Sequence, residues 1–165
     1  TVVAGPDAIA VYSGISWPNT QYAQIKFIST PTSNIGGGIV LRHDTSASYD
    51  GYAVFSFGTL IRVRRSLGGI NTVLSDIGGS LVIANDILYA EIYGSTITVK
   101  VNSKIVGTIS DYNGLSSGSA GIIVFVDAGA AGDCQIDNFD AGGEDGALLV
   151  KNKLRPRIFG PGLAR

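Results

Sequence analysis

The chain has 165 residues, a formal net charge of −1 and one cysteine, Cys134. This length suits a single domain with its own apolar core. The charge gives no global reason to expect nucleic acid or an anionic membrane as partner, and one cysteine excludes an intrachain disulfide. With 45% hydrophobic residues, 15% charged residues and 23 glycines, the composition favours short buried strands joined by tight turns. No apolar run reaches the roughly 18 residues that span a bilayer.

About eleven stretches of the chain alternate apolar and polar residues, or are apolar over the length of a strand. Each is bounded by Gly, Asn, Asp or Ser, which is typical of strands joined by turns. The predicted strands are residues 7–13, 21–29, 36–43, 51–57, 60–66, 70–75, 87–93, 96–101, 104–110, 120–126 and 134–140.

Three of the connections have the residues of two-residue hairpins. They are Gly68-Gly69, Gly94-Ser95 and Asn102-Ser103, where Gly and Asn tolerate the positive φ of such turns. Consecutive hairpins with nothing helical between them predict an antiparallel sandwich rather than alternating strands and helices.

The patterns also predict which strands have two covered faces. In residues 96–101, Ile97, Val99 and Val101 alternate with Thr96, Thr98 and Lys100, so we expect one solvated face. Residues 120–126 do not alternate, which predicts a central strand that is covered on both faces.

Four motifs resemble those of concanavalin A-like lectin/glucanase domains, in particular the laminin-G-like modules of bacteria and phages. They are Gly38 to Arg42, Ile97 to Asn102, Asp111 to Gly121 and Ile136 to Phe139. The resemblance covers roughly residues 7 to 141. It implies an all-β fold, an antiparallel two-sheet jelly-roll sandwich, here with an extended C-terminal arm. Members of this class include sugar-binding modules, glycosidases, adhesion domains and virion parts, so the resemblance implies a fold more than an activity.

The sequence lacks the carboxylate pattern of the catalytic members. Those members carry E-x-D-x-x-E or E-x-D-x-E on one central strand, because two carboxylates must flank the scissile bond. Here Glu91 stands in "YAEIY" without such a partner, and no G-x-S-x-G, H-E-x-x-H or P-loop is present. We therefore predict that the protein is not an enzyme.

Sugar recognition in such modules uses an aromatic ring that stacks on the sugar, with a few polar groups beside it. Trp17 lies in the polar loop "SGISWPNTQY", and Tyr49, Tyr52 and Tyr112 lie in loops or near strand ends. These four residues are the candidate ligand-binding residues. The alternative for Trp17 is that its ring seals one end of the sandwich core.

No metal site is predicted with any specificity. His43 and Asp44 are adjacent but point to opposite faces of a strand, so we expect a solvated strand end there. Calcium is a possible cofactor through Asp127, Asp133, Asp137 and Asn138, although their spacing follows no known loop code. The segment "LIRVRRS" places Arg62 and Arg64 on one face. A solvated outer face is expected, and a strip for acidic glycans or a protein partner is the alternative.

Residues 1–141 are predicted to form the sandwich, 142–147 a glycine-rich hinge and 148–165 a basic arm containing two prolines. The charge changes sign along the chain, with a net −6 over residues 1–147 and +5 over 148–165. Such an arm suits attachment to an acidic surface of its own domain or of a neighbour. The residues expected to attach it are Lys151, Lys153, Arg155, Arg157, Ile158, Phe159 and Arg165.

The sequence therefore predicts a non-enzymatic structural or adhesion protein, such as a capsid decoration or tail-associated component of a phage virion. We expect it to be located on the virion surface or outside the cell. Other protein subunits are the expected partners, in a homo-oligomer or lattice, with glycans as further partners and without nucleic acid or a membrane span. The alternative is a carbohydrate-binding module of a secreted or surface protein.

Overall fold

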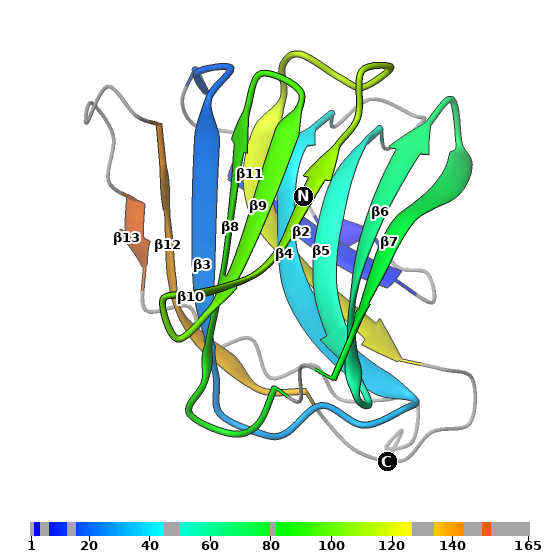
Figure 1. Ribbon diagram of the computed structural model, residues 1–165. Coiled ribbons are helices and arrows are strands. Elements are labelled where there is room, and N and C mark those ends of the chain that lie inside the picture. Colours follow the sequence, from blue (N-terminus) through cyan, green and yellow to red (C-terminus); the bar gives the residue numbers. More distant parts are fainter. Residues whose placement is uncertain are drawn as a thin grey trace.

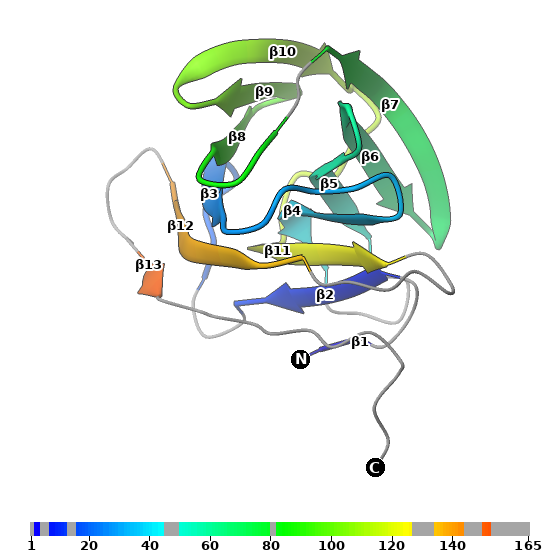
Figure 2. The same ribbon diagram turned by 90° about the horizontal axis from the view of Figure 1, so that it is seen from below.

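The computed structural model describes residues 2–3, 7–12, 16–44, 50–79, 82–126, 134–143 and 150–152. These residues form two antiparallel sheets that face each other around a shared interior (Figures 1 and 2). One sheet has seven strands in the order β1 (Val2–Val3), β2 (Asp7–Val11), β11 (Ser119–Val126), β4 (Ile35–His43), β5 (Gly51–Phe57), β6 (Leu60–Leu67) and β7 (Ile70–Gly78). The other has six strands in the order β10 (Lys104–Ser110), β9 (Thr96–Val101), β8 (Ile87–Tyr93), β3 (Gln21–Phe27), β12 (Ile136–Gly142) and β13 (Val150–Asn152).

The eleven predicted strands are all present, and the all-β jelly-roll prediction is confirmed. The chain changes sheets between β2 and β3, β3 and β4, β7 and β8, β10 and β11, and β11 and β12. The observed β7 extends three residues beyond the prediction, because Gly78 pairs with Leu60 of β6. Strands β1 and β13 were not predicted, since two or three residues are too short to show a period.

The hairpin turns have the predicted backbone. Asn102 and Ser103 have φ of 49° and 70°, and Gly94 has φ of 55°. Asn102 also fixes its turn from the side chain, since its Oδ1 accepts a hydrogen bond from the Ile87 backbone N–H at 2.9 Å. Residues that tolerate positive φ therefore set the register of these two hairpins.

The main core lies between the sheets and comes from the inward residues of alternating strands. Strand β3 shows the rule, with Ala23, Ile25 and Phe27 buried and the residues between them half-buried. In β9, Ile97 and Val99 are buried while Thr98 and Lys100 lie on the opposite face, as predicted.

Strand β11 has covered residues on both faces, which confirms the prediction for residues 120–126. Ile122 and Val124 belong to the core between the sheets. Ile123 points the other way and packs with Val40 and Phe55 in a second apolar cluster on the outer face of the seven-stranded sheet. A continuous apolar run was the correct signal for a strand buried on both sides.

The strands β7 and β10 lie side by side at one edge of the sandwich (Figure 2). Each carries a bulge. Leu74 is the extra residue in β7, between Val73 and Ser75, and Val106 is the extra residue in β10. A Cβ placed on Gly107 of β10 would lie 2.5 Å from Ile77 Cδ1 of β7, so the two edges are closely packed.

Three residues of the predicted C-terminal arm add a strand to the sandwich. Strand β13 pairs antiparallel with β12, with Lys151 opposite Asp140 in the register. For these three residues, the chain pairs with its own domain, as in the fold-back alternative. The other residues expected to attach the arm lie outside the described residues; they are Lys153, Arg155, Arg157, Ile158, Phe159 and Arg165.

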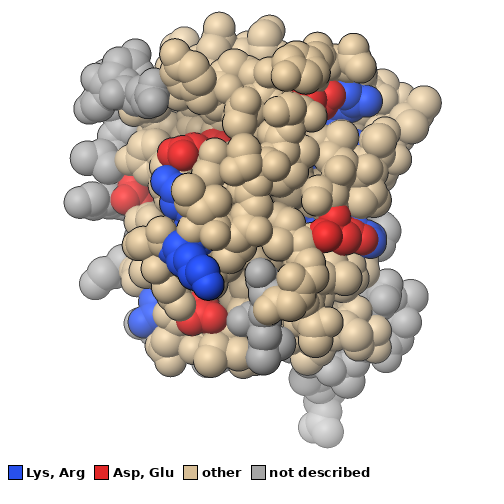
Figure 3. All heavy atoms as spheres, viewed as in Figure 1, with Lys and Arg blue, Asp and Glu red and all other residues tan. Residues whose placement is uncertain are grey.

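Charged side chains are sparse on the face shown in Figure 3, and there basic and acidic atoms lie beside each other. Two ion pairs among the described residues are Arg62 with Asp76, at 2.7 Å, and Lys100 with Glu91, at 3.3 Å. Within the described ranges, no helix is long and apolar enough to cross a membrane.

Candidate functional site

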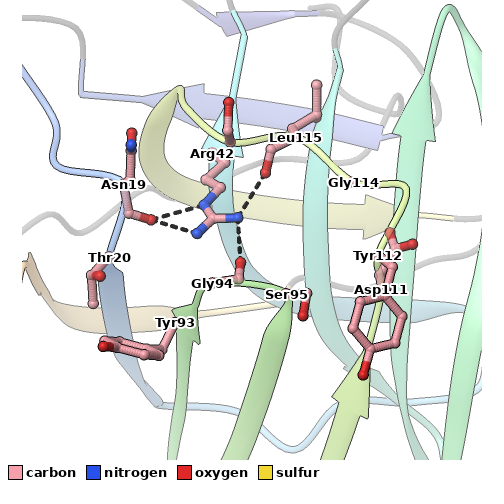
Figure 4. A pocket seen from close by; sticks show the side chains of 11 residues that line it. Asn19, Thr20, Arg42, Tyr93, Gly94, Ser95, Asp111, Tyr112, Gly114 and Leu115 are labelled. Carbon is pink, nitrogen blue, oxygen red and sulfur yellow. Dashed lines mark hydrogen bonds between the residues drawn. The ribbon is translucent and has the colours of Figure 1, made fainter.

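A pocket of about 510 Å³ lies at the end of the sandwich where connections from both sheets meet (Figure 4). It is built from the β2–β3 connection, the end of β4, the β8–β9 turn and the β10–β11 connection. Its lining residues are Arg42 together with residues 19–20, 93–95, 111–112 and 114–116. Four separate chain segments therefore create the pocket.

Arg42 joins three of these segments through its guanidinium group. Nε and Nη2 donate to the Asn19 carbonyl at 2.9 and 2.6 Å, and Nη1 donates to the carbonyls of Gly94 at 2.9 Å and Leu115 at 2.7 Å (Figure 4). Arg42 is 4% exposed, and its burial lowers its pKa. A planar group with five donors is suited to this role, because it can hold several carbonyls in fixed directions.

Gln21 at the start of β3 connects the β2–β3 connection, the end of β4 and the β10–β11 connection. Its Nε2 donates to the carbonyls of Pro18 at 2.9 Å and Gly118 at 2.6 Å, and its Oε1 accepts from the Arg42 backbone N–H at 2.8 Å. Gln21 is 1% exposed, so its amide is a buried polar group with its hydrogen bonds made.

Asp111 anchors the other side of the pocket. Its carboxylate accepts from Arg65 Nη1 at 2.8 and 2.9 Å, from the Tyr52 hydroxyl at 3.1 Å and from the Asn113 backbone N–H at 3.2 Å. Burial and the neighbouring Asp111 carboxylate raise the pKa of Tyr52 to about 12. The hydroxyl therefore remains a donor at all ordinary pH values.

Two tyrosine rings stand at the rim, on either side of the Gly94–Ser95 turn (Figure 4). Tyr112 is 85% exposed and Tyr93 is 63% exposed. Large exposed rings beside a pocket of this size provide apolar surface for a ligand, while Asn19, Thr20, Ser95 and Ser116 provide polar groups.

The structure separates the four aromatic candidates. Tyr112 lies at the pocket. Tyr52 is 1% exposed, so its ring has no face for a ligand, and its hydroxyl donates a hydrogen bond to Asp111. Trp17 is half-buried against the main core, and its Nε1 donates to the Tyr12 carbonyl at 2.7 Å, which agrees with the alternative that it seals the core. Tyr49 lies outside the described residues.

Sequence reasoning missed Tyr93 and the role of Arg42. Tyr93 is the last residue of β8, directly before a predicted hairpin turn, and an aromatic residue at that place was a usable signal. Arg42 was seen only as part of a motif that matches the fold. Its partners Asn19, Gly94 and Leu115 are 23, 52 and 73 residues away, so no local pattern identified them.

The expectation of a solvated strand end at His43 was wrong, because His43 is 3% exposed. Gly51 of the neighbouring strand makes room for the ring, since a Cβ there would lie 2.9 Å from His43 Cδ2. Burial lowers the pKa of His43, against the opposing effect of Asp44 and Asp50.

The described residues contain no cluster of three or more His, Cys, Asp or Glu side chains that would hold a metal ion. Of the four residues considered for calcium, Asp137 and Asn138 lie in β12. Asp127 and Asp133 lie outside the described ranges.

Two arginines of β6, Arg62 and Arg64, lie over aromatic rings, and they share one face of the strand as predicted. Arg62 lies over the Phe57 ring, at 5.0 Å from its centroid, and Arg64 lies over the Phe55 ring, at 5.3 Å. Arg62 also forms a two-bond ion pair with Asp76. Arg65 points away from this strip to Asp111.

No protein-family model and no curated protein sequence matches the chain. Several solved structures share its fold at low sequence identity. A carbohydrate-binding module, CBM66 from Bacillus subtilis, is 19% identical with a TM-score of 0.62, over 73% of this chain and 74% of that one. Sheep galectin-11, solved with glycerol, is 12% identical with a TM-score of 0.57, over 79% of this chain and 96% of that one. A tetrameric galectin from the ball sponge Cinachyrella sp. is 11% identical with a TM-score of 0.56, over 83% of this chain and 99% of that one. The chain thus has the concanavalin A-like jelly-roll fold that the motif resemblance implied.

Proposed function

We propose that this chain is a carbohydrate-binding module without a catalytic role, and that the pocket around Arg42 is its sugar site. The observation that carries the proposal is the pair of exposed rings, Tyr93 and Tyr112, beside a pocket lined with small polar groups. The fold it shares with a carbohydrate-binding module and two galectins supports this reading.

The dimensions of the pocket suit a small ligand. Its volume of about 510 Å³ falls within the range of roughly 300–1,000 Å³ that is usual for small-molecule sites. The hydrogen bonds of Arg42 and Gln21 hold the pocket in shape without a ligand, so little ordering is needed on binding. A preformed site of this kind favours recognition of one or two sugar units.

The assembly role stays a prediction from the sequence. The similarity to sugar-binding proteins favours the carbohydrate-binding alternative over the virion component. Attachment through the basic residues that follow β13, and a location on a virion or outside the cell, are further predictions that rest on the sequence alone.

The test is a glycan array followed by calorimetry with the best ligand. We expect binding by the full chain, and a loss of about ten-fold in affinity for Tyr112→Ala and for Tyr93→Ala, because each removes a stacking face. Tyr12→Ala is the matched control. Tyr12 is 38% exposed and does not line the pocket, so its removal should leave the affinity unchanged.

Two outcomes would contradict the proposal. One is the absence of any bound glycan on an array that covers neutral and acidic oligosaccharides. The other is a glycan whose affinity falls in Tyr12→Ala while it is unchanged in both rim variants, which would move the site away from the pocket.

A further inference from the structure

The charges around the pocket do not cancel. Within the described residues, every hydrogen bond of the Arg42 guanidinium goes to a backbone carbonyl and none goes to a carboxylate. Carbonyl oxygens satisfy the N–H groups, but they carry only partial charges and leave the formal positive charge in place.

Among the described lining residues, the one carboxylate, Asp111, is already neutralised. Both oxygens of Asp111 accept from Arg65 Nη1, and the Tyr52 hydroxyl and the Asn113 N–H take further acceptor positions. The side chains of Asp111 and Arg65 are 7% and 16% exposed, so this ion pair is sheltered from solvent. Asp111 therefore has little charge left to oppose that of Arg42.

The described part of the pocket wall contains one arginine, Arg42, and one carboxylate, Asp111. Because Asp111 is paired with Arg65, which does not line the pocket, these three groups together leave a surplus of one positive charge. We propose that the pocket prefers saccharides that carry an anionic group, such as a uronic acid, over the matching neutral sugars. This inference rests on the proposed function and adds the class of ligand to it.

The position of Arg42 strengthens its effect. An interaction between charges is several times stronger near a protein interior than in water, and a sheltered charge is screened less by salt. Arg42 is 4% exposed and lies in the wall of the pocket, so a carboxylate of the ligand would meet its field in a partly desolvated setting. Neutral sugars carry only dipoles and gain less from this field than an anionic group does.

The test compares pairs of oligosaccharides that differ only in the acid group. The probes are galacturonate, glucuronate and mannuronate oligomers, each with its neutral hexose counterpart, and a sulfated galactose oligomer separates carboxylate from sulfate. We expect at least one acidic member to bind about ten-fold more tightly than its neutral partner. We expect this preference to shrink in about 0.5 M NaCl.

Charge variants at the rim test the cause. Ser116 is exposed and lines the pocket, so Ser116→Asp should lower the ratio of acidic to neutral affinity and Ser116→Lys should raise it. Lys104→Gln is the control, because it removes one positive charge from the start of β10, at the other end of that strand from Asp111.

The results distinguish the two proposals. Neutral sugars that bind as well as or better than acidic ones, with a ratio that does not respond to Ser116, would overturn the charge preference and leave the sugar site standing. If no member of any pair binds, both proposals are wrong.

Discussion

Arg42 uses two guanidinium nitrogens, Nε and Nη2, to hold the single carbonyl oxygen of Asn19, at 2.9 and 2.6 Å. Arg42, near the end of β4 in the seven-stranded sheet, thereby fixes the β2–β3 connection, which leads into β3 of the six-stranded sheet. Nη1 also donates to the carbonyls of Gly94 and Leu115. The shape of the pocket therefore depends on Arg42 more than on the residues at its rim.

Replacing Arg42 with lysine should therefore damage both stability and binding. A lysine ammonium has three donors on a flexible stem and cannot reproduce the four bonds to three segments. We expect Arg42→Lys to lower the free energy of unfolding by about 2–4 kcal/mol in urea titrations, and to weaken glycan binding even where the protein is folded. Arg62→Lys, on the exposed face of β6, should change the free energy of unfolding by less than about 1 kcal/mol. Equal effects of the two substitutions would remove the special role of Arg42.

A methyl group at Gly114 should lower the stability of the fold, because it would collide with the Tyr52 side chain. A Cβ at Gly114 would lie 1.3 Å from the Tyr52 hydroxyl oxygen, so the β10–β11 connection would have to move away from Tyr52. We expect Gly114→Ala to cost about 1–3 kcal/mol of stability, and we expect Tyr52→Phe to recover part of this cost in the double variant. Gly78→Ala is the control, because nothing lies within 4 Å of a Cβ there. Additive effects of the Gly114 and Tyr52 changes would show that the two residues do not interact.

Two ion pairs of arginine with aspartate among the described residues have similar lengths but different burial, and their contributions to stability should differ accordingly. Asp111→Asn leaves the Arg65 charge in a sheltered place, so we expect a loss of about 2–3 kcal/mol in the free energy of unfolding. Asp76→Asn breaks the exposed pair with Arg62, for which we expect less than about 1 kcal/mol. Chemical denaturation of the two variants under identical conditions compares them directly.

Stability should fall as the pH is lowered below about 6.5, because of His43. Burial lowers the pKa of this histidine in the folded protein, while the unfolded chain keeps the ordinary value of 6.5. Below that value the unfolded state binds a proton that the folded state resists, so the free energy of unfolding decreases. The decrease ends once the pH has passed below the folded pKa.

Urea titrations between about pH 7.5 and pH 5 measure this effect, with His43→Gln as the variant that cannot titrate. The lowered pKa of Asp76, caused by its bonds with Arg62, acts at more acidic pH, because its contribution is lost only as the pH falls below the ordinary value of 3.8. The free energy of unfolding of the wild type should therefore change with pH between about pH 7.5 and pH 5, and this dependence should vanish in His43→Gln. Parallel slopes would show that His43 is not responsible.

The sequence predicted the sheets better than the site, for physical reasons. The order of apolar residues within a strand depends on which of its faces are covered. Alternation in residues 96–101 and the apolar run of residues 120–126 therefore identified two strands and their burial. The bonds of Arg42 depend on how the β2–β3, β8–β9 and β10–β11 connections meet in space. Polar side chains in loops show no period, and a strand-end arginine looks the same whether it faces solvent or three carbonyls. The burial of His43 escaped prediction likewise, because it depends on Gly51 in the neighbouring strand.

The bulges at Leu74 and Val106 have a consequence for how this chain behaves at high concentration. A nine-residue outer strand with a single charged side chain, such as β7, is in general a template on which other chains can assemble into fibrils. An extra residue in the middle of the strand twists it and interrupts the regular row of free N–H and C=O groups. Because both neighbouring outer strands contain such an interruption, we expect the protein to resist stacking edge to edge despite its strongly β-forming composition.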